Sequence, residues 1–168
     1  QVRGAESRLH ELATAHHEGR IASAVWVEQM RTEVRRLELQ QVALAKGGFD
    51  QLSQRDYGRA GASLRDQYAK IISTAQDVID GKVSLPQLLN RVDGHVGEGR
   101  RLFYQTQRDN APTGDADTTT IARRTLDPGA QHCADCPAYY DLGWVRAGEI
   151  VAPGGSCQCG SHCRCGVI

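Results

Sequence analysis

Cysteine is missing from most of this 168-residue chain. The first 132 residues contain none, and all six cysteines lie between Cys133 and Cys165. Disulfides therefore cannot cross-link the tail to the rest of the chain, because every cysteine lies in the same short segment. The cysteines therefore belong to one local cluster near the C-terminal end.

Net charge and long apolar runs are missing as well. The 20 Lys and Arg residues balance 20 Asp and Glu residues, and up to Asp109 the counts are 16 and 14. This balance predicts no strongly basic face, so binding driven by nucleic-acid phosphates has little support. No segment is apolar and long enough to span a membrane, and there is no signal-peptide pattern. The chain begins at Gln1 without a methionine, so we expect a piece of a longer product.

Aromatic residues make up only 5% of the sequence, and the chain instead places aliphatic side chains at helical spacing. Helices are predicted over residues 6–17, 23–46, 53–79 and from 84 toward 109, with Ser23 and Ser53 as N-caps. Each of the three long helices has one apolar stripe. The stripes are Trp26, Met30, Val34, Leu37 and Leu44 in the helix over 23–46; Leu64, Tyr68, Ile71, Ala75 and Val78 in the helix over 53–79; and Leu88, Leu89, Val92, Val96 and Phe103 in the helix from 84. The predicted fold class is mainly α, an antiparallel long-helix bundle or a set of extended helical hairpins.

Two groups of glycines interrupt the predicted helices. Gly58 and Gly61 each weaken the third helix by about 1 kcal/mol relative to alanine, and we expect them to mark a close approach by another backbone. Gly94, Gly97 and Gly99 in the fourth helix follow no strand and do not have the spacing of a phosphate-binding loop. They indicate a kink or a packing contact.

The composition changes after Asp109. Residues 110–120 are small, polar and acidic, and residues 121–126 have the pattern of a strand. We predict a helical domain over residues 1–109, a linker with a lead-in strand over 110–130, and a cysteine-rich tail over 131–168. Residues 137–156 are expected to form a hairpin or loop, since Tyr139 and Tyr140 favour strands.

The cysteines are spaced for a tetrahedral zinc site. Cys133 and Cys136 form a Cys-x-x-Cys pair, and a second cluster follows after an intervening loop: Cys157, Cys159, Cys163 and Cys165. A Cys-x-x-Cys turn can direct two thiolates at one ion, and a second cluster supplies the other two. Side chains of an extended Cys-x-Cys point to opposite faces, so each of the two Cys-x-Cys pairs is expected to contribute one thiolate. His132 and His162 are reserve ligands.

Two other interpretations of the cysteines remain open. An even number of cysteines in a short segment is also typical of two or three disulfides. Cys133 beside His132 could act as nucleophile and base, but sequence neighbours rarely form such a pair. We favour zinc because the Cys-x-x-Cys pair has a matching second cluster.

Several runs of residues resemble a known protein family. They are Gly47-Gly48-Phe49-Asp50-Gln51-Leu52, Asp56-Tyr57-Gly58-Arg59-Ala60-Gly61 and Gln67-Tyr68 in the helical part, and Gln131-His132-Cys133-Ala134-Asp135-Cys136, Pro153-Gly154 and Cys163-Arg164-Cys165 in the tail. These runs resemble structural proteins of tailed bacteriophages. The Cys-Arg-Cys ending is similar to the C-terminal part of the Mu F-like head morphogenesis, or minor head protein, family. The resemblance covers the chain from about Gly19 onward, and the tail motif is its more specific part.

The resemblance implies a ligand set and a function. It favours four ligands for one Zn2+: Cys133, Cys136, Cys159 and Cys163. Cys165 is the likeliest substitute for one of them, and Cys157 is expected to be supernumerary. It implies a virion component of the head or head-to-tail region, whose partners are capsid or portal proteins and copies of itself. The alternative is a zinc-ribbon module that docks on nucleic acid or a transcription complex, which the low charge of the tail disfavours. An enzyme is not expected, because catalytic zinc needs an open coordination position and a nearby acid or base.

Overall fold

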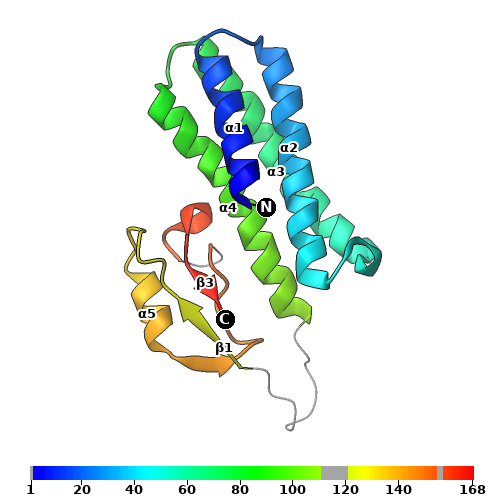
Figure 1. The fold of residues 1–168 in the computed structure, drawn as a ribbon, viewed down its shortest axis with the longest axis vertical. Coiled ribbons are helices and arrows are strands. Elements are labelled where there is room, and N and C mark those ends of the chain that lie inside the picture. Colours follow the sequence, from blue (N-terminus) through cyan, green and yellow to red (C-terminus); the bar gives the residue numbers. More distant parts are fainter. Residues whose placement is uncertain (1, 111–120, 155–156) are drawn as a thin grey trace.

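The computed structural model describes residues 2–110, 121–154 and 157–168. Its helical part contains α1 (Val2–His17), α2 (Ser23–Lys46), the short 3-10 helix η1 (Phe49–Gln51), α3 (Gln54–Ile79) and α4 (Leu85–Asn110). The part from residue 121 onward is called the tail from here on, because β1 shares a sheet with its strands. It contains β1 (Ile121–Thr125), α5 (Asp135–Asp141), β2 (Trp144–Arg146), the 3-10 helix η2 (Gly160–His162) and β3 (Gly166–Val167). Figure 1 shows the long helices as an elongated bundle with the tail beside α4. The predicted mainly α fold class is confirmed.

The ends of the long helices follow local sequence signals. Gly47, with φ of 91°, ends α2 in the left-handed conformation that glycine adopts without strain. At the start of α3, Ser53 and Asp56 form a capping box, in which each side chain accepts a hydrogen bond from the other residue's backbone N–H. The predicted cap at Ser23 is wrong by one position, because Ser23 is already helical and Ala22 precedes it without a side-chain cap.

The bundle core is built around α2, which packs against α1, α3 and α4. The buried side chains meet in one cluster that includes Leu9, Trp26, Met30, Val34, Leu37, Ile71, Leu88 and Val92. Leu44 was expected in this core but is 52% exposed. Toward its C-terminal end α2 turns polar residues inward, with Glu38 and Gln41 buried beside Val42. The apolar pattern alone therefore does not follow the buried face there. In α4, Leu102 is buried and the predicted Phe103 is only half-buried.

The glycines of α3 and α4 have different surroundings. A Cβ added at Gly58 or Gly61 would meet no heavy atom within 4 Å outside its own helix backbone. The predicted close backbone approach at these two glycines is therefore wrong. A Cβ at Gly97 would collide with the carbonyl oxygen of Ser161 in η2. The packing-contact interpretation is thus confirmed for Gly97, which lets η2 sit directly on α4.

β1 is the central strand of a three-stranded antiparallel sheet with the order β2-β1-β3. Ala122 pairs with Val145 of β2, and Arg124 pairs with Val167 of β3. The predicted strand over 121–126 is confirmed, whereas most of the predicted linker, residues 111–120, lies outside the described residues. β1 shares its sheet with the strands of the tail. Within the described part of the chain, no helix has the length and apolar character that crossing a bilayer requires.

The segment after the first cysteine pair is a helix, not the start of a hairpin. Tyr139 and Tyr140 lie in α5, so their assignment to a strand is wrong. Pro137 sits in the first turn of α5, where the missing backbone N–H breaks no helical hydrogen bond. The Arg123 guanidinium of β1 lies 4.4 Å from the centre of the Tyr140 ring. This stacking on β1 holds α5 against the sheet.

Candidate metal centre

Two local turns and the segment between η2 and β3 bring the six cysteines together. Cys133 and Cys136 flank the first turn of α5, where the Cys136 N–H donates to the Cys133 carbonyl at 3.2 Å. Cys157 and Cys159 lie in a turn closed by a 2.9 Å hydrogen bond from the Gly160 N–H to the Cys157 carbonyl. The remaining two, Cys163 and Cys165, lie between η2 and β3. The tail therefore collects its thiols in one buried cluster.

Four of the thiols are arranged as the ligands of a single ion would be. The sulfurs of Cys133, Cys136, Cys157 and Cys159 all lie within 4.8 Å of one another. Cys136 Sγ is 3.6 Å from Cys133 Sγ and 3.6 Å from Cys159 Sγ. Metal–sulfur bonds of about 2.3 Å in a tetrahedron place neighbouring sulfurs about 3.8 Å apart, whereas a disulfide needs about 2.05 Å. All six cysteines are free, and this group could hold a metal ion.

Three of the five predicted ligands belong to this group, and two lie beside it. Cys163 Sγ is 3.8 Å from Cys136 Sγ. Cys165 Sγ is 3.5 Å from Nδ1 of His132, which was considered a reserve ligand. His132, Cys136 and Cys165 form a second group within 4.8 Å. The other reserve ligand, His162, is exposed in η2 and belongs to neither group.

Cys157 was set aside as supernumerary, yet the structure places it in the four-thiol group. The resemblance favoured Cys159 over Cys157, and the expectation of a single thiolate from this pair rested on an extended Cys-x-Cys. Cys159 instead has φ of −64° and ψ of −24°. The chain bends at this point, so the side chains of Cys157 and Cys159 approach the same centre instead of pointing to opposite faces. Gly160, with φ of 52°, was the available signal for this bend.

Arg124 is the site residue that sequence reasoning missed. Its side chain comes from β1 and is only 1% exposed. Nη2 lies 3.6 Å from Cys163 Sγ and 3.9 Å from Cys136 Sγ, and Nη1 donates to the Val151 carbonyl at 3.1 Å. A guanidinium in this position favours the thiolate form of its neighbours. The alternation of β1, which turns Ala122 and Arg124 to the same buried side, was the signal.

The thiols of the cluster have unequal pKa values. Burial opposes ionisation of Cys133, but hydrogen bonds from Cys159 and Cys136 outweigh it and lower the pKa to about 6. At Cys163, burial is likewise outweighed by hydrogen bonds and by the charge of Arg124, which lower the pKa to about 7. Burial and hydrogen bonds to neighbouring thiols raise the pKa of Cys136. Burial and the hydrogen bond to the Cys133 thiol raise the pKa of Cys159 to about 11. A divalent cation would favour thiolates at all of its ligands, so metal binding is coupled to proton release.

Four of the six cysteines are buried, Cys133 and Cys159 are half-buried, and the cluster is attached to the bundle. Cys136 and Cys165 are 0% and 1% exposed. Arg100 of α4 donates from Nη1 to the Cys163 carbonyl at 3.2 Å, close to the contact between Gly97 and Ser161. Among the described residues, the metal-capable groups that contain cysteine include no carboxylate. These properties are typical of a structural metal site.

No family model, curated protein or solved structure matches the chain. Its function is therefore inferred from the chemistry of the site, the exposed surface and the motifs in the sequence.

Proposed function

We propose that the chain is a structural protein of a tailed-bacteriophage particle, in which one Zn2+ holds the C-terminal tail in its folded form. The observation that carries the proposal is the closed four-thiol group of Cys133, Cys136, Cys157 and Cys159. Four thiolates at tetrahedral spacing suit Zn2+, and closed thiolate sites contribute folding free energy without catalysis. A tail of this size has few large apolar residues, so it needs a bound metal ion to stabilise its fold.

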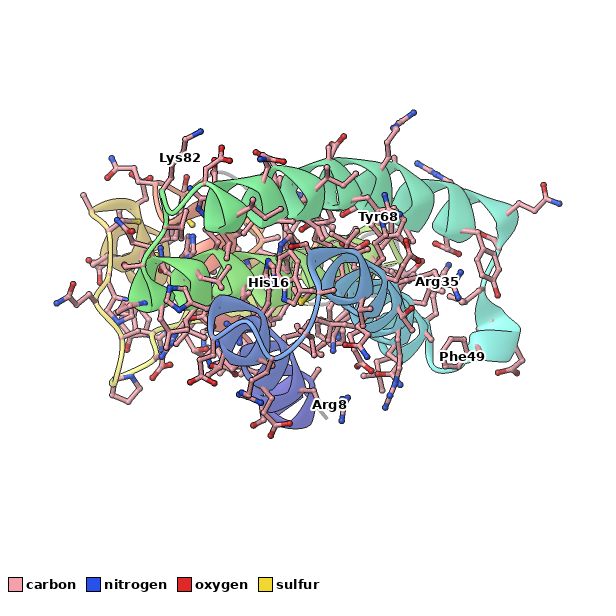
Figure 2. All side chains as sticks on the ribbon, turned by 90° about the horizontal axis from the view of Figure 1, so that it is seen from above. Arg8, His16, Arg35, Phe49, Tyr68 and Lys82 are labelled. Atoms are coloured by element: carbon pink, nitrogen blue, oxygen red, sulfur yellow. The ribbon has the colours of Figure 1, made fainter. Side chains whose placement is uncertain are left out.

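Exposed apolar side chains support a role in protein–protein contacts. Leu44, Phe49 and Tyr57, which flank the connection between α2 and α3, are 52%, 57% and 50% exposed. Figure 2 shows Phe49 at the outer edge of the molecule, on the short helix η1. Apolar side chains gathered at one end of a protein favour a contact surface. We propose that capsid or portal proteins, or another copy of this chain, cover this end in the virion.

The sequence resemblance supports the position in the particle. The tail motifs around Cys133 and Cys163 are similar to those of Mu F-like head morphogenesis proteins, and both motifs lie in the cysteine cluster. A minor head protein or a protein of the head-to-tail region therefore fits the chain best. No catalytic role is proposed.

The alternative is a zinc-ribbon module that docks on nucleic acid or a transcription complex. The position of the tail's arginines disfavours it. Arg124 is buried against thiols and Arg123 stacks on Tyr140, so neither is presented to phosphates. Within residues 131–168, Arg146 and Arg164 remain, and they are outnumbered by three acidic residues: Asp135, Asp141 and Glu149. Phosphate contacts need more free cationic side chains than this.

The test is quantitative mass spectrometry of purified particles from the phage or induced prophage that encodes the chain. We expect the chain in the particles at a defined copy number. A Cys136→Ser variant should be incorporated less and give less stable particles, whereas the matched Ser161→Ala variant, which keeps every thiol, should behave as the wild type.

Absence of the chain from particles would overturn the virion role. Binding of the purified protein to DNA or RNA that weakens steeply with salt would instead favour the zinc-ribbon alternative.

A further inference from the structure

The cysteine cluster contains more ligands than one ion uses. A tetrahedral ion takes four ligands, and the four-thiol group leaves Cys163, Cys165 and His132 beside it. Cys163 and Cys165 are 3% and 1% exposed, so they are as deeply buried as Cys136 and Cys157 and more buried than Cys133 and Cys159. Buried ionisable groups normally have partners that compensate the loss of water.

Cys136 is the common member of both metal-capable groups. One group contains it together with three thiols, and the other contains it together with His132 and Cys165. Its sulfur also lies 3.8 Å from that of Cys163. A thiolate can bridge two metal ions. A bridging sulfur bonds both ions, so it must lie close to the other ligands of each ion. Cys136 occupies that central position.

Cys163 lies next to the second group, and two distances among His132, Cys136, Cys163 and Cys165 match the edges of a tetrahedron. With metal–sulfur bonds of about 2.3 Å and metal–nitrogen bonds of about 2.0–2.1 Å, sulfur–sulfur edges are about 3.8 Å and sulfur–nitrogen edges about 3.6 Å. The Cys136–Cys163 sulfur distance is 3.8 Å, and Cys165 Sγ lies 3.5 Å from His132 Nδ1.

We propose that the tail binds a second Zn2+ through His132, Cys163, Cys165 and a bridging Cys136 thiolate. Two tetrahedral ions that share one ligand need seven ligands in all, and the six cysteines with His132 supply that number. The inference rests on the proposed structural site, because the first ion occupies the other three thiols together with Cys136. On binding, each coordinating thiol loses its S–H proton to solvent, and no oxidation or reduction takes place.

Arg124 supplies charge that such a centre requires. Six thiolates carry more negative charge than two divalent ions neutralise, and the difference would be buried. The Arg124 guanidinium lies 3.6 Å from Cys163 and 3.9 Å from Cys136, on the side of the cluster that the second ion would occupy. N–H donors on metal-bound sulfur are the usual outer-shell partners of thiolate centres. Its position suits a centre with thiolates at both cysteines.

The test is native mass spectrometry of the complete, reduced protein after loading with Zn2+ alone. We expect two ions in the wild type and one in His132→Ala. The matched control is His162→Ala, which removes a neighbouring exposed histidine outside both groups and should keep two ions. Cys165→Ser is the second variant and should also keep one ion.

The outcomes separate this inference from the proposed function. One ion in the wild type and one in His132→Ala would overturn the second site and leave the single structural zinc standing. No ion in the reduced wild type would overturn both. Two ions in His132→Ala would overturn the assignment of this histidine and with it the proposed ligand set.

The bridge has a spectroscopic signature of its own. In protein loaded with cadmium-113 we expect two NMR resonances that are coupled to each other through the shared sulfur. His132→Ala should remove one resonance together with the coupling. Two resonances without coupling would overturn the bridging role of Cys136.

Discussion

The helical bundle and the cysteine-rich tail bury different kinds of side chain. The bundle buries large apolar residues completely, among them Trp26, Met30 and Ile71. Among the described residues of the tail, the buried ones are four cysteines, one arginine and five others: Cys136, Cys157, Cys163, Cys165, Arg124, Ala122, Ile150, Ala152, Pro153 and Gly154. Apolar burial contributes about 25 cal/mol per Å², so the bundle can rely on it and the tail cannot. One chain thus contains a hydrophobic core and, beside it, a core of thiols that could hold a metal ion.

Removing the metal is the strongest test of this difference. We expect a high-affinity chelator to unfold the tail and to leave α1–α4 folded, because structural zinc contributes roughly 10–16 kcal/mol in zinc-finger peptides. Hydrogen exchange followed by mass spectrometry should show loss of protection in β1, α5 and β3. Added Zn2+ should restore it. Unfolding of α2 and α3 in the same step would contradict the separation into two cores.

A cavity in the bundle should destabilise the helices and leave the metal content of the tail unchanged. Ile71 is 0% exposed and its neighbour Ile72 is 50% exposed. We expect Ile71→Ala to lower the free energy of unfolding of the bundle by about 2–5 kcal/mol, through lost burial and the cavity that remains. Ile72→Ala is the matched control and should change it by less than about 0.5 kcal/mol.

Helical circular dichroism during chemical denaturation measures both isoleucine variants. The metal content should stay at the wild-type value. Loss of metal from Ile71→Ala under native conditions would show that the tail depends on the bundle core.

Glu38 makes the stability of the bundle depend on pH. This carboxyl group is 0% exposed and accepts a 2.9 Å hydrogen bond from the Ser63 hydroxyl. Burial raises its pKa from about 4.5 to about 7, although the Ser63 hydrogen bond acts in the opposite direction. The folded state therefore binds this proton more tightly than the unfolded state. The resulting stabilisation is complete below pH 4.5 and is lost as the pH rises to 7.

Replacing this carboxyl group should remove that dependence. Relative to the wild type, Glu38→Gln should gain roughly 2–3 kcal/mol of unfolding free energy between pH 4.5 and 7. His95, whose pKa burial lowers to about 4, acts in the opposite direction in both proteins and cancels in the difference. Glu28→Gln on the exposed face of α2 is the control. Parallel pH profiles of Glu38→Gln and the wild type would contradict the prediction.

The contact between the two regions should respond to a single methyl group. A Cβ at Gly97 collides with the Ser161 carbonyl, whereas a Cβ at Gly94 meets the Ser161 hydroxyl at an ordinary 3.6 Å. We expect Gly97→Ala to weaken the docking of η2 by about 1–3 kcal/mol, while the metal stays bound. Gly94→Ala should be neutral or slightly stabilising, because alanine favours the helix by up to about 1 kcal/mol.

Limited proteolysis of the tail measures this docking. Cleavage should become faster in Gly97→Ala only. Equal cleavage rates in Gly97→Ala and Gly94→Ala would mean that the tail is held on α4 by other contacts.

The sequence predicted the long helices well because their signals are local. The apolar stripe of α2, the glycine at its end and the capping box of Ser53 and Asp56 act within a few residues. The stripe failed at Leu44 because buried polar residues, Glu38 and Gln41, continue the inner face of the helix. Strand propensity failed at Tyr139 because packing on β1 outweighs a weak local preference.

The candidate site was predicted in part. The collection of the cysteines near one centre follows from their spacing, and the strand that carries Arg124 was also foreseen. Which thiols share a centre depends on backbone torsions, and the bend at Cys159 brings Cys157 into the four-thiol group. No local sequence pattern predicts these backbone torsions.

The helical part and the thiol-rich tail can be read from the amino-acid sequence, because helical periodicity, helix caps and cysteine spacing are local properties. Three further features follow only from the folded chain: the two metal-capable groups that meet at Cys136, the burial of Arg124 among thiols, and the contact of η2 with Gly97. Each of these depends on atoms that are distant in the chain and close in space, so only the folded backbone defines them.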